Sequence, residues 1–153
     1  MSKHIALFLV GTLFAGCASA PRLPALPTAS KVDLPRFMGD WYVIANIPTL
    51  IEKGAYNAVE SYQRDADGSI ATTFTFNKDG FDGPRKTYQP RGFVVDRASN
   101  AREYVWIMAR TPTLSTVDYC RLHRQVADAG YDLTKLRQVP QGSAREPIAC
   151  PQD

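Results

Sequence analysis

The chain has 153 residues, of which 44% are hydrophobic, enough for one core and too few for a second full domain. Its formal net charge is +3, and its lysines and arginines are scattered among acidic residues. This balance argues against a nucleic-acid-binding protein, in which basic residues gather in patches.

The N-terminus is typical of an exported protein. Residues 1–16 combine a short basic head with an apolar run from Ile5 to Phe14. That run is too short to span a bilayer as a permanent helix but has the length of a signal-peptide core. We therefore expect residues 1–16 to be removed.

The end of this segment, LFAGC at residues 13–17, resembles the lipobox of bacterial lipoproteins, in which the cysteine is acylated and becomes the new N-terminus. The resemblance implies a lipid anchor on Cys17. Ala18 stands where an aspartate tends to retain such lipoproteins in the inner membrane, so the implied location is the periplasmic face of the outer membrane. The alternative is an ordinary signal peptide with a chance cysteine.

Residues 17–31 connect the anchor to the folded part. The segment ASAPRLPALPTAS holds three prolines, which favours an extended, semi-rigid tether of roughly 3 Å per residue. A single domain is expected over residues 32–153.

The domain is predicted to be all-β. Short runs rich in β-branched and aromatic residues are bounded by turn residues, and Asp65–Gly68 predicts a hairpin turn. Such spacing is typical of an antiparallel barrel or sandwich. The expected strands are 39–47, 56–64, 69–77, 87–95 and 103–109.

One helix follows the strands. Ser115 is a good N-cap, apolar residues recur at helical spacing, and Gly130 supplies a left-handed stop. We expect this helix to pack on the outside of the sheet. Residues 136–139 are expected to add a short edge strand.

Two segments carry a family resemblance. The stretch VDLPRFMGDWYVIANIP is similar to the start of bacterial outer-membrane lipocalins, and YVWIMARTPTLS resembles their last barrel strand running into the helix. The resemblance implies an up-and-down barrel with a C-terminal helix outside and a cavity for fatty acids or lysophospholipids. It also implies a barrel-closing signature of Gly39, Trp41 and Arg110, in which the guanidinium lies over the indole.

The chain departs from the family in length. Three strands, about thirty residues, are missing between the fourth and last expected strands, which leaves five of the usual eight. We therefore expect a shortened or incomplete barrel. The joining residues 96–102 either run extended, which keeps both ends of the barrel in place, or turn tightly, which reverses the last strand.

The missing strands leave the ligand site open to two interpretations. If the barrel closes narrowly, its own side chains fill the interior; if the sheet stays open, the same side chains line a groove. The candidate residues are Phe74, Phe76, Trp106 and Met108. We expect weak lipid binding and a homodimer formed through unpaired strand edges.

Two cysteines remain once Cys17 is lipidated. The periplasm is oxidising, so a Cys120–Cys150 disulfide is expected to fasten the proline-containing tail to the helix. The alternative is that Cys120 is a small core residue.

Catalytic residues are scarce in this sequence. His4 leaves with the signal peptide, and His123 has no cysteine or carboxylate at metal-ligand spacing, so we expect no enzyme activity, metal or cofactor. The favoured function is an outer-membrane lipoprotein that binds, stores or transports lipids for membrane maintenance. The alternative is an anchored β-protein without a cavity that acts structurally or by pairing its edges.

Overall fold

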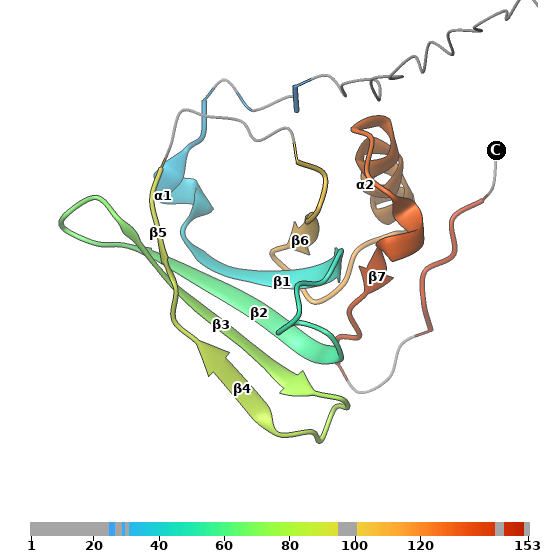
Figure 1. The fold of residues 1–153 in the computed structure, drawn as a ribbon, viewed down its shortest axis with the longest axis horizontal. Helices are drawn as coiled ribbons and strands as arrows, with labels where there is room; N and C mark the ends of the chain where they lie inside the picture. Colours follow the sequence, from blue (N-terminus) through green and yellow to red (C-terminus); the bar gives the residue numbers. More distant parts are fainter. Residues whose placement is uncertain (1–24, 27–28, 30, 95–100, 143–145, 152–153) are drawn as a thin grey trace, which may run out of the picture.

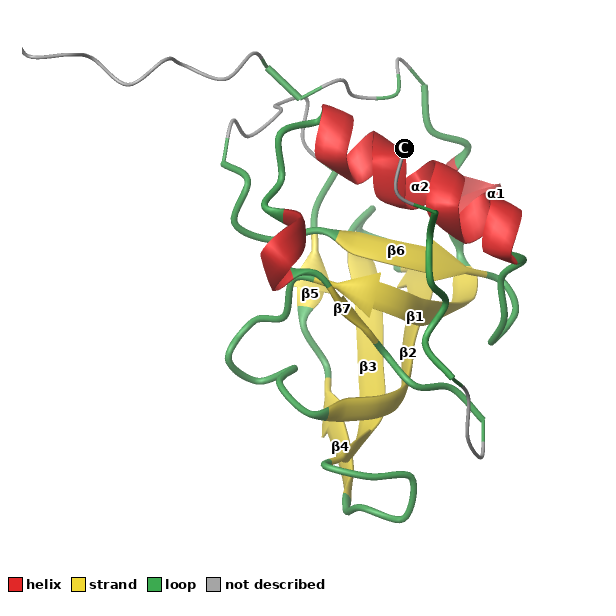
Figure 2. Cartoon of the chain, turned by 90° about the vertical axis from the view of Figure 1, so that its right-hand side faces the viewer, coloured by secondary structure: helices red, strands yellow, loops and turns green. Residues whose placement is uncertain are grey.

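The structure is a computed structural model that describes residues 25–26, 29, 31–94, 101–142 and 146–151. Its main feature is one antiparallel sheet with a helix on one face (Figures 1 and 2). In chain order the elements are α1 (Leu34–Phe37), β1 (Gly39–Asn46), β2 (Ala55–Arg64), β3 (Ile70–Lys78), β4 (Arg85–Tyr88), β5 (Arg91–Gly92), β6 (Trp106–Ala109), α2 (Thr116–Asp128), the 3-10 helix η1 (Leu133–Lys135) and β7 (Arg137–Gln138).

The strand order along the sheet is β4-β3-β2-β1-β6, with β5 paired to β3 and β7 paired to β1. Among the described residues no pairing joins β4 to β6, so the sheet is not closed. The expected fold class, an incomplete antiparallel barrel with one C-terminal helix outside, is confirmed. The path of residues 96–102 falls largely outside the described part of the chain.

The hairpin of β2 and β3 is confirmed, with Arg64 opposite Ile70 at its closed end. Gly68 has φ +84°, and its N–H donates to the carbonyl of Asp65 at 3.0 Å. The Arg91 guanidinium lies 2.9 Å from the Asp65 carboxylate and stabilises this turn.

The expected strand 87–95 is wrong as a single element. The chain pairs with β3 as two pieces, β4 and β5, in one unbroken register: Tyr88 is opposite Phe74, and Arg91 is opposite Ala71. Pro90 lies between them, and it has no N–H to donate to the ladder. The expected strand 103–109 is also too long, because ladder pairing begins only at Trp106.

The predicted helix is confirmed. The Ser115 hydroxyl accepts a hydrogen bond from the Asp118 N–H at 3.0 Å, and Gly130 ends the helix with φ +85°. Tyr119 and Val126 are buried against Ile44 and other residues of the outer sheet face. Among the described residues no helix is long and apolar enough to cross a bilayer.

The short helix α1 was not predicted. The Asp33 side chain accepts from the Arg36 N–H at 3.1 Å, and Pro35 lies in the first turn. An aspartate followed by a proline two residues later is a helix-start signal, so the sequence did contain the information.

The expected short edge strand at 136–139 forms as β7 (Arg137–Gln138), which pairs with β1 and has no second strand partner among the described residues. The segment after β7 lies between β1 and β2, where those strands diverge. The buried Gln141 amide donates 2.9 Å hydrogen bonds to the carbonyls of both Val43 and Ala58. The C-terminal segment therefore fills the split between the two strands.

Candidate functional site

The signature residues come together at one end of the sheet. The Arg110 guanidinium carbon lies 3.9 Å from the centroid of the Trp41 ring. Its Nη atoms donate to the carbonyls of Met38 and Asp40 at 2.9 and 2.8 Å. Gly39 has φ +92°, a conformation that side-chain-bearing residues rarely adopt. The arrangement joins the end of β6 to the start of β1 and to helix α1.

The four candidate ligand-lining residues lie on one face of the sheet, which we call the inner face. The strand registers define this face, because residues directly opposite one another on neighbouring strands share a face. One such set is Trp41, Glu60, Phe74 and Tyr88, and another is Val43 and Met108. Helix α2 covers the opposite, outer face. The inner face is therefore the one left for a ligand.

The candidates on the inner face differ in exposure. Phe76 is 0% exposed and Phe74 is 6% exposed, with their ring centroids 5.2 Å apart. Trp106 is 37% exposed and Met108 is half-buried. The phenylalanines therefore form a packed floor, while the other two side chains remain accessible.

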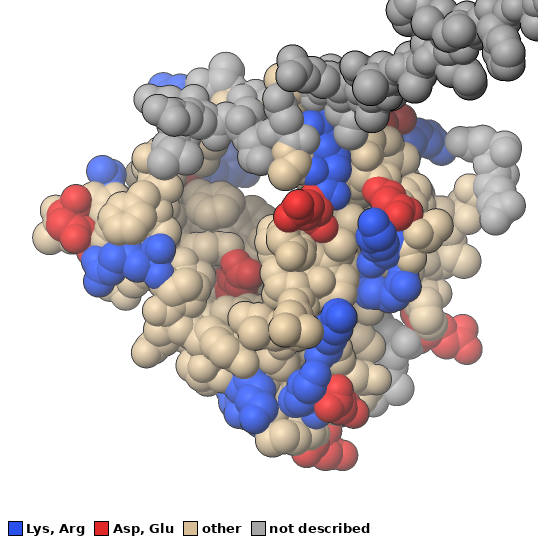
Figure 3. Space-filling view, viewed as in Figure 1, with Lys and Arg blue, Asp and Glu red and all other residues tan. Residues whose placement is uncertain are grey.

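A space-filling view shows how this face is shaped. Figure 3 shows a hollow beside the sheet with uncharged side chains over most of its surface and an acidic side chain inside it. Basic side chains lie mainly around its outside.

One acidic side chain not predicted as a site residue is Glu52, in the loop between β1 and β2. It is only 5% exposed, and one of its carboxylate oxygens accepts from the Trp106 indole N–H at 2.7 Å. The other oxygen accepts from the Thr49 N–H and hydroxyl at 2.8 and 2.6 Å. These bonds fix the orientation of the Trp106 ring at the end of the sheet opposite Trp41.

A second acidic residue that was missed is Glu60. Its carboxylate accepts a hydrogen bond from the Tyr62 hydroxyl. Burial raises the pKa of Glu60, and the charge of Glu52 raises it further, whereas the hydrogen bond from Tyr62 opposes this rise. Burial and the Glu60 carboxylate together raise the pKa of Tyr62 as well. Glu60 is therefore a destabilised carboxylate beside the aromatic floor.

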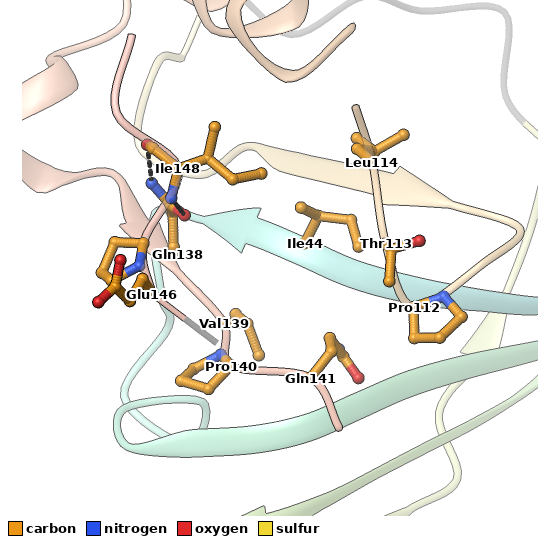
Figure 4. A pocket seen from close by; sticks show the side chains of 11 residues that line it. Ile44, Pro112, Thr113, Leu114, Gln138, Val139, Pro140, Gln141, Glu146 and Ile148 are labelled. Atoms are coloured by element: carbon orange, nitrogen blue, oxygen red, sulfur yellow. Dashed lines mark hydrogen bonds between the residues drawn. The ribbon is translucent and has the colours of Figure 1, made fainter. Parts of the chain in front are cut away.

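The predicted cysteine pair lies on the outer side of the molecule. The Sγ atoms of Cys120 and Cys150 are 2.06 Å apart in the structure, which is bonding distance. The nearby tail is held by paired hydrogen bonds between Gln138 and Ile148, at 2.7 and 2.8 Å (Figure 4). Oxidation of this pair in the cell stays a prediction.

The hollow drawn in Figure 4 lies between Ile44, the tail and the segment 112–114. Its volume is about 80 Å³, well below the several hundred Å³ of a typical ligand pocket. A larger hollow of about 650 Å³ lies beneath the loop 47–56, next to Arg137 and Pro140. Neither includes the inner-face phenylalanines.

The predicted lipid anchor, Cys17, lies outside the described residues, as do nearly all of the expected signal peptide and tether. These remain predictions from the sequence. Among the described residues no group of three or more histidine, cysteine or acidic side chains is arranged to hold a metal ion.

The open antiparallel sheet, the outer helix and the Trp41–Arg110 pair together define the class of protein. A family model described as "Lipocalin-like domain" matches residues 32–102 and 97–141, most of the chain. The chain belongs to this lipocalin family, whose members are generally binding proteins for small hydrophobic molecules rather than enzymes.

Individual relatives are distant. The chain is 23% identical to "Outer membrane lipoprotein Blc" of Vibrio cholerae, covering 91% of this chain and 99% of the relative. It is 22% identical to "Temperature-induced lipocalin-1" of Arabidopsis thaliana, covering 80% of this chain and 87% of the relative. Lobster apocrustacyanin A1 has the same fold, with a TM-score of 0.55 at 13% identity over 82% of this chain and 94% of that one.

The alignments also support the shortened barrel. The alignment to the Vibrio protein spans 173 positions but includes only 91% of this 153-residue chain, about 139 residues. Subtracting these 139 residues from the 173 aligned positions leaves about 34 positions of the alignment that have no counterpart in this chain. The two matched stretches of the family model overlap at residues 97–102, within the joining segment 96–102 from which three strands are expected to be missing.

Proposed function

We propose that this chain is a lipid-anchored lipoprotein on the periplasmic face of the outer membrane that binds fatty acids or lysophospholipids for membrane maintenance. The ligand's acyl chain lies along the inner face of the open sheet. The LFAGC motif and the relatives named outer membrane lipoprotein support the location.

The observation that carries this proposal is the composition of the inner face. A packed floor of Phe74 and Phe76 is flanked by the more accessible Met108 and Trp106, while no strand pairing among the described residues closes the sheet above them. At about 25 cal/mol per Å² of apolar area, a half-enclosed acyl chain still reaches micromolar affinity.

Ligand binding can be measured by the protein's own fluorescence, because its two tryptophans, Trp41 and Trp106, both lie on the inner face. A soluble form carrying Cys17→Ala is titrated with a lysophospholipid below its micelle concentration. We expect a saturable fluorescence change in the micromolar range.

A pair of variants localises the site. Met108→Ala removes apolar area from the inner face and should weaken binding by about three- to tenfold. Val117→Ala removes an exposed apolar side chain from α2 and should leave binding unchanged. A titration without saturation, or equal effects of the two variants, would contradict the proposal.

A second candidate function is an anchored β-protein without a ligand cavity. The complete burial of Phe76 favours it, because the floor of the inner face is already filled by the protein's own side chains. In that case the lysophospholipid titration gives no signal while the protein still self-associates through its strand edges.

The anchor is tested separately. Cys17 should be diacylated and N-acylated, because a single acyl chain gives only weak membrane attachment. The intact mass of the mature protein decides this point. A mature species that begins at Ala18 or later, without acyl mass, would contradict it.

A further inference from the structure

Glu60 lies in the centre of the inner face. The strand registers place it directly opposite Trp41 of β1 on one side and opposite Phe74 of β3 on the other. It is half-buried, so its carboxylate remains within reach of a bound molecule. The ion pairs of the described residues do not include it.

The other charged or titratable groups on this side do not neutralise Glu60. The adjacent Tyr62 hydroxyl donates to it, and Glu52 adds a second negative charge to its surroundings. Arg110, just after β6, is already in contact with the Trp41 ring and donates to the carbonyls of Phe37, Met38 and Asp40. Two of the other basic side chains that the described strands place on this face have partners of their own: Lys78 at the end of β3 pairs with Asp79, and Arg137 of β7 donates to the Thr134 carbonyl. The other charged or titratable groups of the described strands on this face are Arg64 at the hairpin end, Lys86 and Tyr88 on β4, and Tyr104 beside Trp106; Tyr88 stacks on the phenylalanine floor.

An acyl ligand on the aromatic floor would bring its polar end close to a carboxylate that water solvates poorly. A second carboxylate there adds like-charge repulsion in a region of reduced dielectric. A hydroxyl or ammonium group instead donates a hydrogen bond to Glu60 and satisfies it.

We infer that the inner face selects acyl ligands whose polar end donates hydrogen bonds, a hydroxyl or an ammonium group, and disfavours a free carboxylate, with Glu60 as the acceptor. This inference rests on the proposed function and narrows its ligand class. Glu60 acts here as a specificity-determining residue for the lipid's polar end.

The test compares three probes with the same sixteen-carbon chain length: 1-palmitoylglycerol, hexadecylamine and palmitate, each below its micelle concentration. They are titrated into the Cys17→Ala chain at about pH 8, where palmitate is ionised, while tryptophan fluorescence is followed. The glycerol ester and the amine distinguish a hydroxyl donor from an ammonium donor. We expect at least one of them to bind about tenfold or more tightly than palmitate.

Glu60→Gln is the decisive variant, because the amide oxygen still accepts the Tyr62 hydrogen bond while the charge is removed. It should bring palmitate to within about threefold of the glycerol ester and weaken the amine. Glu146→Gln, a matched change at an exposed site on the tail, should change none of the three affinities. Far-UV circular dichroism and the melting temperature show whether each variant is folded.

The outcomes separate this inference from the proposed function. If palmitate binds as tightly as the other two probes, or if Glu60→Gln leaves the order of affinities unchanged, the inference is wrong and the lipid-binding function stands. If none of the probes binds any folded form, both are wrong.

Discussion

Arg110 and Trp41, which are 69 positions apart in the chain, are in direct contact: the guanidinium carbon lies 3.9 Å from the centroid of the indole ring. The same guanidinium donates to the carbonyls of Phe37 and Met38 at 3.0 and 2.9 Å. One side chain therefore holds the end of β6, the start of β1 and the C-terminus of α1 together.

Substitution of Arg110 should destabilise this end of the sheet. Arg110→Lys retains the charge but loses the planar guanidinium, which stacks on Trp41 and donates several hydrogen bonds. Arg110→Lys should therefore lower the free energy of unfolding nearly as much as Arg110→Ala, by about 1–3 kcal/mol. Urea unfolding followed by circular dichroism measures both. Arg121→Lys, at an exposed position on α2, is the control, and full retention of stability in Arg110→Lys would contradict the proposed stacking role.

The Cys120–Cys150 bond should contribute substantially to stability. It closes a loop with a sequence separation of 30 residues, which corresponds to roughly 3–4 kcal/mol in the chain-entropy model. We expect the double variant Cys120→Ser/Cys150→Ser to lose about this much and to become insensitive to reductant. Two reactive thiols in the denatured, non-reduced Cys17→Ala protein would show that the bond does not form.

Stability should also depend on pH through Glu60. Its pKa is raised in the folded state mainly by burial, so the folded protein holds the proton more tightly than the unfolded chain. The stabilisation that comes from this tighter proton binding is fully present below the pKa of Glu60 in the unfolded chain. It is lost as pH rises through the pKa of Glu60 in the folded protein. The unfolding free energy of Glu60→Gln should therefore rise relative to wild type as pH increases above about 4.5.

Urea unfolding at a series of pH values measures this difference, with Glu146→Gln as the reference. If the difference in unfolding free energy between wild type and Glu60→Gln stays constant across the pH series, Glu60 has the same pKa in the folded and unfolded states, and the prediction is wrong.

Self-association should occur through the strand edges. β4 and β6 end the sheet order, and an uncovered edge is a template for pairing with another chain. We expect the soluble Cys17→Ala form to sediment as a concentration-dependent dimer. Tight one-to-one lipid binding by a strict monomer would instead indicate a closed barrel and a wrong strand count.

Local sequence features determined much of the fold. The limits of α2 follow from the Ser115 cap and the Gly130 stop, and the β2–β3 hairpin follows from its turn residues, because these effects act within a few positions of the chain. The signature pair was expected from the family resemblance. The break between β4 and β5 was also readable, since Pro90 cannot donate to a ladder.

Tertiary structure decided the polar part of the site. Glu60 faces Phe74 because the hairpin pairs Arg64 with Ile70, and it faces Trp41 because the separate β1–β2 ladder pairs Gly39 with Tyr62. A shift of β2 by one residue would move Glu60 to the opposite face. Turn composition alone does not specify that register. Glu52 is close to Trp106 although they are 54 positions apart, and such contacts depend on how loops return to the sheet. The sequence therefore determined the strands β1 to β3 and helix α2, whereas packing determined which carboxylates lie beside the aromatic side chains of the inner face.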